Sequence, residues 1–179
     1  MGNTKRDALV VLQARAGDRD SLEQLLSGVQ GRLRGYIVGV VGATAADDVL
    51  QDTLIQICRN LKWLRDPELF LPWAYRIASR SCFKTLKRDR RFTQAEEDTD
   101  FPEESTSVTQ PELQLFSEVP ELLQKISPSS RAVLSLHYLR ELSIQEVAAI
   151  LEIGVGTAKS RLAYGLSCLR KLVTEKEKL

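Results

Sequence analysis

Apolar residues recur along the chain at spacings of three and four, and only this helical period recurs. It runs from Asp7 to about Gly42, then over residues 46–61 and 71–91, and again through the last third of the sequence. The pattern predicts an all-α protein built from short amphipathic helices.

The first two predicted helices are separated by a stop at Gly17. Asp18 or Asp20 can cap the second helix, which continues to about Gly42 with an expected break near Gly31. Their apolar residues are expected in the core: Leu9, Leu12, Ala16, Leu22, Leu25, Leu26, Val29, Leu33, Tyr36, Ile37 and Val40.

The helix predicted over residues 46–61 has one apolar stripe and one acidic, polar face. The stripe consists of Leu50, Leu54, Ile57 and Leu61. Asp48, Gln51 and Asp52 share another face because they are spaced at i, i+3 and i+4. Acids in a first turn complement the helix dipole, and the same face can dock a basic partner. Both interpretations stay open on these residues alone.

The helix predicted over residues 71–91 begins beside Pro72, which suits a first helical turn. Its expected inward face is Trp73, Ile77, Ser81 and Leu86. A basic stripe lies beside three aromatic residues: Arg76, Arg80, Lys84, Lys87 and Arg88, with Trp73, Tyr75 and Phe83. Cations that follow phosphates and rings that stack on bases suit melted nucleic acid. A solvated basic helix end is the alternative.

Charge is segregated along the chain although the net charge is only +1. Residues 1–91 contain sixteen Lys and Arg against ten Asp and Glu, residues 92–124 none against nine, and residues 125–179 nine against five. Residues 93–110 are acidic, rich in Ser and Thr and poor in apolar side chains, which predicts a flexible linker. Two basic blocks around it suggest two domains that bind a polyanion.

The linker therefore separates two small helical domains, residues 1–92 and residues 111–179. In the second, helical spacing covers residues 111–126, and Ser127-Pro128 can cap a helix from about Ser129 to Glu141.

Two further helices follow Glu141 and meet at a short turn. Ser143 and Glu146 form a capping box that starts the first of them. Gly154 and Gly156 permit a sharp turn before the second begins near Thr157. The second helix should pack through Ala158, Leu162, Gly165, Leu169 and Leu172, which leaves Lys159, Ser160, Arg161 and Tyr164 outside. Short polar and cationic side chains at the start of a second helix suit the major groove; an ordinary helical hairpin is the alternative.

Several function classes lack their signatures. Cys58, Cys82 and Cys168 are far apart, without a CxxC motif, and are expected to be buried free thiols. The only histidine, His137, is interpreted as structural. The sequence has no phosphate-binding loop, dinucleotide fingerprint or nucleophile elbow, so we expect no enzyme, metal or cofactor. It has no run of about 18 apolar residues and no secretion signal, so we expect a cytoplasmic protein without membrane insertion.

The motifs, taken in order, resemble those of an extracytoplasmic-function (ECF) sigma factor, a subfamily of the sigma-70-type factors of bacterial RNA polymerase. The matching segments are Ala14-Arg15-Ala16-Gly17-Asp18, Ala46-Asp47-Asp48-Val49-Leu50-Gln51-Asp52-Thr53, Trp73-Ala74-Tyr75-Arg76-Ile77-Ala78, Leu142-Ser143-Ile144-Gln145-Glu146-Val147-Ala148 and Gly156-Thr157-Ala158-Lys159-Ser160-Arg161-Leu162. Each is weak alone, but together they cover most of the chain.

The resemblance implies an alternative sigma factor that binds core RNA polymerase and directs promoter-specific initiation. By it, Asp48, Gln51 and Asp52 dock on the polymerase. Lys62, Trp63, Arg76, Arg80, Lys84, Lys87 and Arg88 bind the minus-ten element. Gly156, Thr157, Lys159, Ser160, Arg161 and Tyr164 bind the minus-thirty-five element. Such factors often have an anti-sigma partner.

Three positions depart from the family pattern. Glu152 stands where a glycine is usual, and a non-glycine residue in a left-handed cap costs about 1 kcal/mol, which suggests a differently built turn. Arg80 replaces a frequent asparagine, and Ala163, Tyr164, Gly165 and Leu166 replace further arginines. With fewer cations on this face, we expect the isolated C-terminal domain to bind DNA weakly. Tethering to polymerase would then supply most of the affinity.

Two other function classes stay open. A stand-alone helix-turn-helix regulator is supported by the C-terminal motif alone, and leaves the acidic face and the basic helix unexplained. A helical module that binds only proteins predicts no salt-dependent affinity for DNA.

Overall fold

The computed structural model describes residues 4–92 and 122–176 of the chain. In these two ranges every regular element is a helix and no strand occurs, which confirms the predicted all-α fold. None of the helices in them has both the length and the apolar character needed to cross a membrane.

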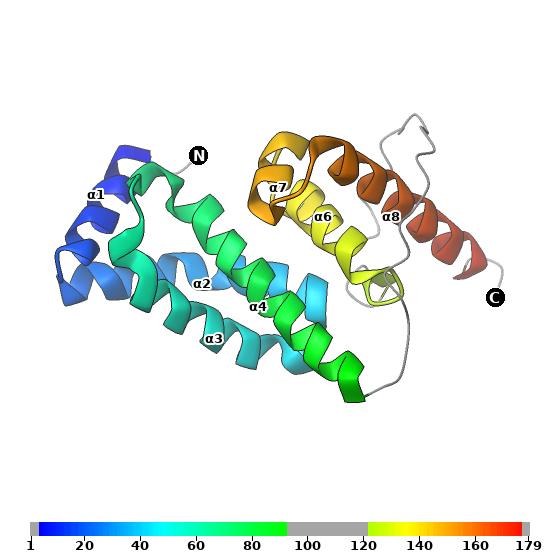
Figure 1. Ribbon diagram of the computed structural model, residues 1–179, viewed down its shortest axis with the longest axis horizontal. Coiled ribbons are helices and arrows are strands. Elements are labelled where there is room, and N and C mark those ends of the chain that lie inside the picture. Colours follow the sequence, from blue (N-terminus) through cyan, green and yellow to red (C-terminus); the bar gives the residue numbers. More distant parts are fainter. Residues whose placement is uncertain (1–3, 93–121, 177–179) are drawn as a thin grey trace.

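The N-terminal group contains four long helices (Figure 1). They are α1 (Thr4–Arg15), α2 (Arg19–Val41), α3 (Ala43–Asn60) and α4 (Phe70–Phe92), with short 3-10 turns at Leu61–Trp63 (η1) and Pro67–Leu69 (η2). Asp18 caps α2 as expected, because its carboxylate accepts the Ser21 backbone N–H at 2.9 Å. Gly17, with φ of +99°, ends α1 in the left-handed region that glycine adopts without strain.

Two predictions about this group were wrong. The helix α2 runs without a break through Gly31, since packing over its whole length outweighs the roughly 1 kcal/mol that an interior glycine costs. In α1 the buried residues are Val11 and Ala14, whereas Leu9, Leu12 and Ala16 are exposed. Apolar residues lie on several faces of α1. Their spacing alone therefore did not show which of these faces is buried.

The C-terminal group contains α6 (Pro128–Leu139), α7 (Ile144–Leu151) and α8 (Val155–Lys176). Ser127 caps α6 by accepting the Ser130 N–H at 3.4 Å, with Pro128 in the first turn. The predicted capping box is present at the start of α7: Glu146 accepts the Ser143 N–H at 2.8 Å. The predicted linker and the helix predicted over residues 111–126, up to residue 121, lie outside the described residues.

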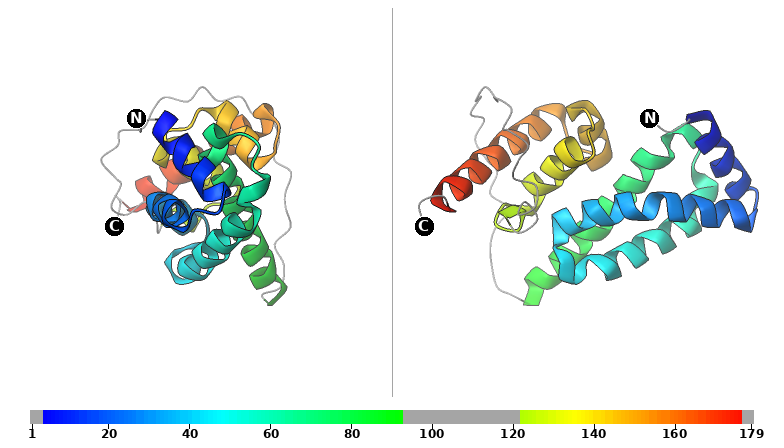
Figure 2. Two further views of the ribbon diagram at one scale, coloured as in Figure 1. Left: turned by 90° about the vertical axis from the view of Figure 1, so that its left-hand side faces the viewer. Right: turned by 180° about the vertical axis from the view of Figure 1, so that it is seen from behind.

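The two groups pack against each other, α2 against α6 and α4 against α7 (Figures 1 and 2). Their buried side chains form one continuous apolar cluster that joins Ile37 and Val40 of α2 to Leu136 of α6. Gly39 allows the close approach, because a Cβ there would lie 2.6 Å from Ser135 Oγ. The helix α1 lies at the end of the N-terminal group that is remote from the C-terminal helices (Figures 1 and 2).

Candidate nucleic-acid and protein interfaces

The predicted acidic face lies on the exposed side of α3. Asp48, Gln51 and Asp52 are all exposed, and the opposite side of the helix is buried through Val49, Leu50, Thr53 and Ile57. The hydrophobic stripe therefore orients the helix as its spacing predicted, and the three polar side chains are available to a partner.

A groove between α2 and α3 lies beside this face. Leu54, the exposed Ile55 and Gln51 are among the residues that line it. Arg34 of α2 and Asp47 of α3 bridge the helices through an exposed ion pair of 2.9 Å. The spacing of the acidic face did not single out Ile55, although it lies four positions after Gln51 and so next to it on the helix surface.

A second groove lies between α3 and α4, and it gathers the predicted aromatic and basic side chains. Trp63 and Trp73 line it together with Arg80, Lys84, Lys87 and Arg88. The α3 wall contributes Asp52, Gln56 and Asn60, which can form hydrogen bonds. The sequence reasoning missed Gln56 and Asn60, although they follow Asp52 at the helical spacing of four.

The turn η1, which contributes Trp63 to this groove, presents an unusually accessible aromatic ring. Trp63 in η1 is 72% exposed, which is high for the residue type with the largest apolar surface. Lys62 Nζ lies 5.1 Å from the centre of the Trp63 ring, within the range of a cation–π contact. A flat ring and a neighbouring cation form a surface on which a base can stack.

Tyr75 does not belong to the aromatic surface predicted for α4. It is buried and makes an edge-to-face contact with Tyr36, with ring centres 5.6 Å apart. The predicted inward residues Trp73, Ile77, Ser81 and Leu86 are half-buried, and Ala74, Tyr75, Ala78, Ser79 and Cys82 are fully buried instead. The helix α4 packs against α2, α3 and α7. It therefore buries more of its circumference than a helix that contacts the core on one side only, and the centre of its buried face is shifted from the predicted one.

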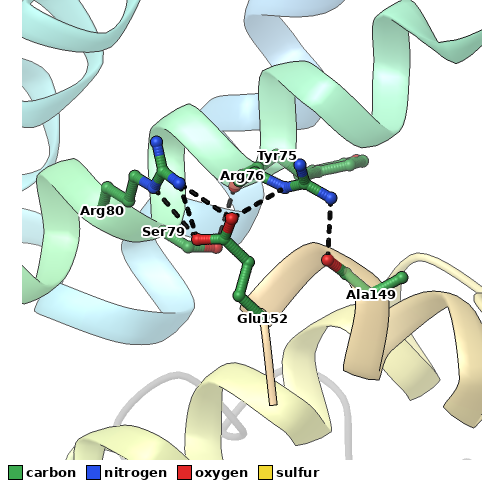
Figure 3. A network of polar contacts seen from close by, with 6 residues as sticks. All are labelled: Tyr75, Arg76, Ser79, Arg80, Ala149 and Glu152. Carbon is green, nitrogen blue, oxygen red and sulfur yellow. Dashed lines mark hydrogen bonds and ion pairs between the residues drawn. The ribbon is translucent and has the colours of Figure 1, made fainter.

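Arg76 does not line the groove and instead turns toward α7 (Figure 3). Its Nη2 donates a hydrogen bond to the Ala149 carbonyl at 2.9 Å. This carbonyl lies in the last turn of α7, where backbone acceptors have no partner within the helix. Arg76 therefore acts in this arrangement as a cap supplied by the other group of helices.

Arg80 lines the groove and also contacts the C-terminal group (Figure 3). Its Nη2 lies 2.7 and 2.8 Å from the two Glu152 carboxylate oxygens, and its Nε donates at 3.2 Å. Arg76 Nε is 3.9 Å from the same carboxylate. The Arg80 hydrogen bonds, and the charges of both arginines, hold the pKa of Glu152 below its usual range although partial desolvation raises it.

Glu152 also determines the turn between α7 and α8. Its φ and ψ of 57° and 42° place it in the left-handed region, and its N–H donates to the Ala148 carbonyl. Gly154 and Gly156 have ordinary backbone angles, so the expectation that they supply the sharp turn was wrong. The suggestion of a differently built turn was also wrong: the usual left-handed cap is present, with glutamate in place of glycine.

The start of α8 is presented to solvent as predicted. Gly156, Thr157, Lys159 and Tyr164 are exposed, Ser160 and Arg161 are half-buried, and Ala158, Leu162 and Gly165 pack inward. The Ser160 hydroxyl donates to the Gly156 carbonyl at 3.1 Å, so its proton is engaged within the helix. The helix dipole and the exposed Lys159 make this end attractive to phosphate.

The cysteines and the histidine differ in burial. Cys82 is buried, and burial raises the pKa of its thiol to about 12. The prediction of buried thiols was wrong for Cys58, which is exposed, and Cys168 is half-buried. His137 Nδ1 forms a 2.7 Å hydrogen bond with the Leu142 carbonyl, in agreement with a structural role. In the described parts of the chain, no group of His, Cys, Asp and Glu side chains could hold a metal ion.

Comparisons with known proteins match both groups of helices. Residues 25–92 match the family described as Sigma-70 region 2, and residues 122–171 match Sigma-70, region 4. The RNA polymerase sigma factor CarQ of Myxococcus xanthus is 27% identical over 166 residues, which cover 91% of this chain and 95% of that protein. The ECF RNA polymerase sigma factor SigW of Bacillus subtilis is 25% identical over 178 residues, covering 90% and 93%.

Solved structures have the same fold. CnrH, in complex with the cytosolic domain of CnrY, gives a TM-score of 0.68 at 22% identity, over 94% of this chain and 97% of that one. The sigma factor RpoE of Bartonella quintana, in complex with the anti-sigma factor NepR, gives 0.67 at 20% identity, over 85% and 96%. With region 2 and region 4 both present, in the order and over the length of its relatives, the chain belongs to the ECF subfamily of sigma-70-type RNA polymerase sigma factors.

Proposed function

We propose that this chain is an alternative sigma factor that binds core RNA polymerase and directs promoter-specific initiation of transcription. The observation that carries the proposal is the groove between α3 and α4, where two tryptophans and four cations converge next to the acidic face of α3. A sigma factor needs both surfaces in one domain, since it must hold polymerase and capture DNA together.

Docking on polymerase is assigned to Asp48, Gln51 and Asp52. Their side chains are exposed on one helix whose other side is anchored in the core, so the surface is held rigidly. The adjoining groove, with Leu54 and Ile55 in its lining, adds an apolar contact that can be buried on association. A basic partner helix with apolar residues at helical spacing fits this surface.

Capture of the minus-ten strand is assigned to the groove between α3 and α4. Trp63, which lines the groove, offers a stacking platform together with the neighbouring Lys62, and Arg80, Lys84, Lys87 and Arg88 follow the phosphates. Arg76 is included in this set on condition that α7 moves away, because its guanidinium donates a hydrogen bond to the Ala149 carbonyl of α7 in the structure. Binding of an unstacked strand offsets the few kcal/mol per step needed to open the duplex, so no hydrolysis is required.

Reading of the minus-thirty-five duplex is assigned to the start of α8. Gly156, Thr157 and Lys159 are exposed there, and a Cβ added to Gly156 would meet no protein atom within 4 Å. Gly156→Ala should therefore leave folding unchanged, and any loss of promoter binding would report a close approach of DNA backbone to this position. Ser160, Arg161 and Tyr164 extend the surface along the helix.

The proposed partners are core polymerase, promoter DNA and an anti-sigma factor. The last is proposed because the similar chain RpoE was solved in complex with the anti-sigma factor NepR. Sigma factors are not enzymes, and we propose that this chain has no catalytic activity and acts in the cytoplasm. The alternative of a stand-alone helix-turn-helix regulator gives no role to residues 25–92, which match Sigma-70 region 2.

Transcription by a reconstituted holoenzyme tests this function. The chain should direct core polymerase to specific start sites in a library of genomic fragments, and absence of any binding to core would reject the proposal. Asp48→Lys combined with Asp52→Lys should weaken core binding at least tenfold while leaving the helical content unchanged. Glu23→Lys, on an exposed part of α2, is the matched control. Equal affinities of the two proteins would reject the assigned docking face.

A further inference from the structure

The acidic face of α3 is divided between two grooves. Gln51 lines the groove between α2 and α3, together with Asp47. Asp52, the next residue, lines the groove between α3 and α4 that is proposed to capture the strand, the strand-capture groove. Consecutive residues of a helix point about 100° apart, so these two side chains face different surroundings. Docking on polymerase alone does not explain why a carboxylate lies in the strand-capture groove.

The two walls of the strand-capture groove differ in their chemistry. The helices that form them, α3 and α4, lie side by side (Figure 1). The α4 wall carries the four cations described above, which attract phosphates. The α3 wall carries Asp52, Gln56 and Asn60, none of which is a cation. Because a carboxylate repels phosphate, a bound strand should turn its backbone toward α4 and its bases toward α3.

The three polar side chains of α3 form a row along the groove. Asp52, Gln56 and Asn60 are each four residues apart, so successive members lie about 6 Å apart along the helix axis. The groove has a volume of about 740 Å³, within the range of about 300–1,000 Å³ for pockets that bind small molecules. A nucleobase is smaller than most such molecules, so at least one base can enter beside the row.

Hydrogen bonds within the row determine which atoms it offers to a base. The Asn60 side-chain amide donates to the Gln56 backbone carbonyl at 2.8 Å and to Gln56 Oε1 at 3.2 Å. These bonds use the side-chain oxygen of Gln56 and leave its Nε2 group as a donor. Among the described residues, no cation lies within ion-pair distance of the Asp52 carboxylate. The row therefore offers an acceptor at Asp52 and a donor one turn later, at Gln56.

An acceptor followed by a donor matches cytosine and adenine better than thymine. Cytosine has an exocyclic amino group that donates, next to a ring nitrogen that accepts, and adenine has the same order of groups. Thymine has a carbonyl oxygen in place of the amino group. An ionised carboxylate only accepts hydrogen bonds, so it repels this oxygen. A carboxylate that accepts from the cytosine amino group is a usual pairing of side chain and base.

We infer that Asp52, together with Gln56, reads the bases of the captured strand and selects cytosine and adenine, which carry this exocyclic amino group, against thymine. The inference rests on the proposed function, since it names the base specificity of the strand-capture groove. The two walls then have separate tasks. The cations of α4 supply affinity that does not depend on sequence, whereas the row on α3 supplies the preference for particular bases.

The test compares binding of the full-length chain to two fluorescent oligonucleotides of about 15 nucleotides, oligodeoxycytidylate and oligodeoxyuridylate. Uracil takes the place of thymine because it lacks the methyl group, so the two strands differ only in the hydrogen-bonding edge of the base. Fluorescence anisotropy at neutral pH should show that the cytosine strand binds at least about fivefold more tightly, the lower limit for one good contact with a base. Equal affinities, or no binding of either strand, would overturn the inference.

The variant Asp52→Asn separates base reading from simple repulsion of DNA. It removes the charge and keeps the size, and an amide can present either its oxygen or its NH₂ group to a base. Both strands should bind more tightly, because one repelling charge is lost. The two affinities should then differ by no more than about twofold, since the contact that discriminates is gone. An equal gain for both strands, which keeps the original ratio, would show that Asp52 only repels DNA.

Asp48→Asn is the matched control. Asp48 is exposed on the same helix, one turn before Asp52, and is not among the residues that line the groove. Its substitution removes the same charge and should leave the ratio of the two affinities unchanged. An equal fall of the ratio for the substitutions at 48 and 52 would reject the inference.

Gln56→Met gives an independent measurement on the same row. The substitution keeps the length of the side chain and removes the donor. It should lower the preference for the cytosine strand at least about twofold, the effect of one weak hydrogen bond. An unchanged preference would remove Gln56 from the proposed reading site.

The two proposals fail separately. If the chain directs transcription with core polymerase but binds the two strands equally, base reading by α3 is rejected and the sigma function stands. If the affinities behave as expected but no transcription is obtained, the sigma function is rejected and a base-selective groove for single strands remains.

Discussion

The two surfaces proposed to face DNA differ in how they are built. The groove between α3 and α4 combines two tryptophans with Arg80, Lys84, Lys87 and Arg88. The start of α8 offers Lys159 and the half-buried Arg161, with Gly165 and Leu166 buried further along the helix. The first surface can hold a strand by stacking and charge, whereas the second has few phosphate contacts. We therefore expect the N-terminal group to supply most of the affinity for DNA, and the C-terminal group to determine where on the promoter the protein binds.

The largest expected effect is the loss of the exposed stacking platform. Trp63→Ala should weaken binding of single-stranded DNA about tenfold, because stacking on an aromatic side chain contributes about 1–3 kcal/mol per base. Fluorescence anisotropy with labelled oligothymidylate measures the change. Leu69→Ala, in the next exposed turn and outside the groove, is the control. If Trp63→Ala binds single-stranded DNA as tightly as Leu69→Ala, stacking on Trp63 does not distinguish the groove from the start of α8.

The charge of the groove should appear in the salt dependence. Lys84→Gln, Lys87→Gln and Arg88→Gln together should reduce the slope of log affinity against log salt by about two for single strands. The control replaces three exposed cations outside the groove, Arg19, Lys125 and Lys171. Titrations at several salt concentrations measure both slopes, and equal slopes would show that these cations do not meet phosphates.

The C-terminal surface should give a smaller effect of the same kind. Lys159→Gln should lower the salt slope for duplex DNA by about 0.9, the value for one phosphate contact, with little effect on single strands. Gel-shift titrations of a duplex by the full chain measure it. A loss much greater than this would mean that α8 binds duplex more strongly than its sparse charge suggests.

The smallest effect concerns acid sensitivity at the start of α7. Hydrogen bonds from the Ser143 hydroxyl and N–H hold the pKa of Glu146 below its ordinary value of 4.5. The stabilisation is therefore fully present above pH 4.5 and is lost as the pH falls through the lowered pKa. Glu146→Gln should make the unfolding midpoint less dependent on pH as the pH falls below about 4.5. An unchanged pH profile would contradict a role for this carboxylate.

Sequence reasoning predicted those parts of the molecule that local chemistry determines. The caps at Asp18, Ser127 and Ser143 form within three or four residues of themselves, so their hydrogen bonds follow from spacing alone. The same holds for the exposed polar face of α3, because its opposite stripe is strongly apolar. Periodicity located the α-helices α1 to α4 and α6 to α8 for this reason, but not the short 3-10 helices η1 and η2.

The errors occur where packing between distant segments decides. Tyr75 was expected beside the basic stripe, but contact with Tyr36, thirty-nine positions earlier in the chain, buries it. Arg76 was expected to face DNA, but a backbone carbonyl of α7 attracts it. Glu152 was noticed only as a departure from a motif, because the arginines that it meets lie more than seventy positions away. The spacing of residues along one helix carries no information about such partners.

The glycines of α2 have a consequence for the stability of that helix. Gly28, Gly31, Gly35 and Gly39 lie in one continuous helix, and Gly39 supports α6 directly. Each interior glycine lowers the intrinsic helix propensity by about 1 kcal/mol relative to alanine. The second half of α2 therefore depends on its neighbours for its stability. Amide protons of this half should therefore exchange with solvent faster in a variant that weakens the contact between α2 and α6, such as one with a larger side chain at Gly39.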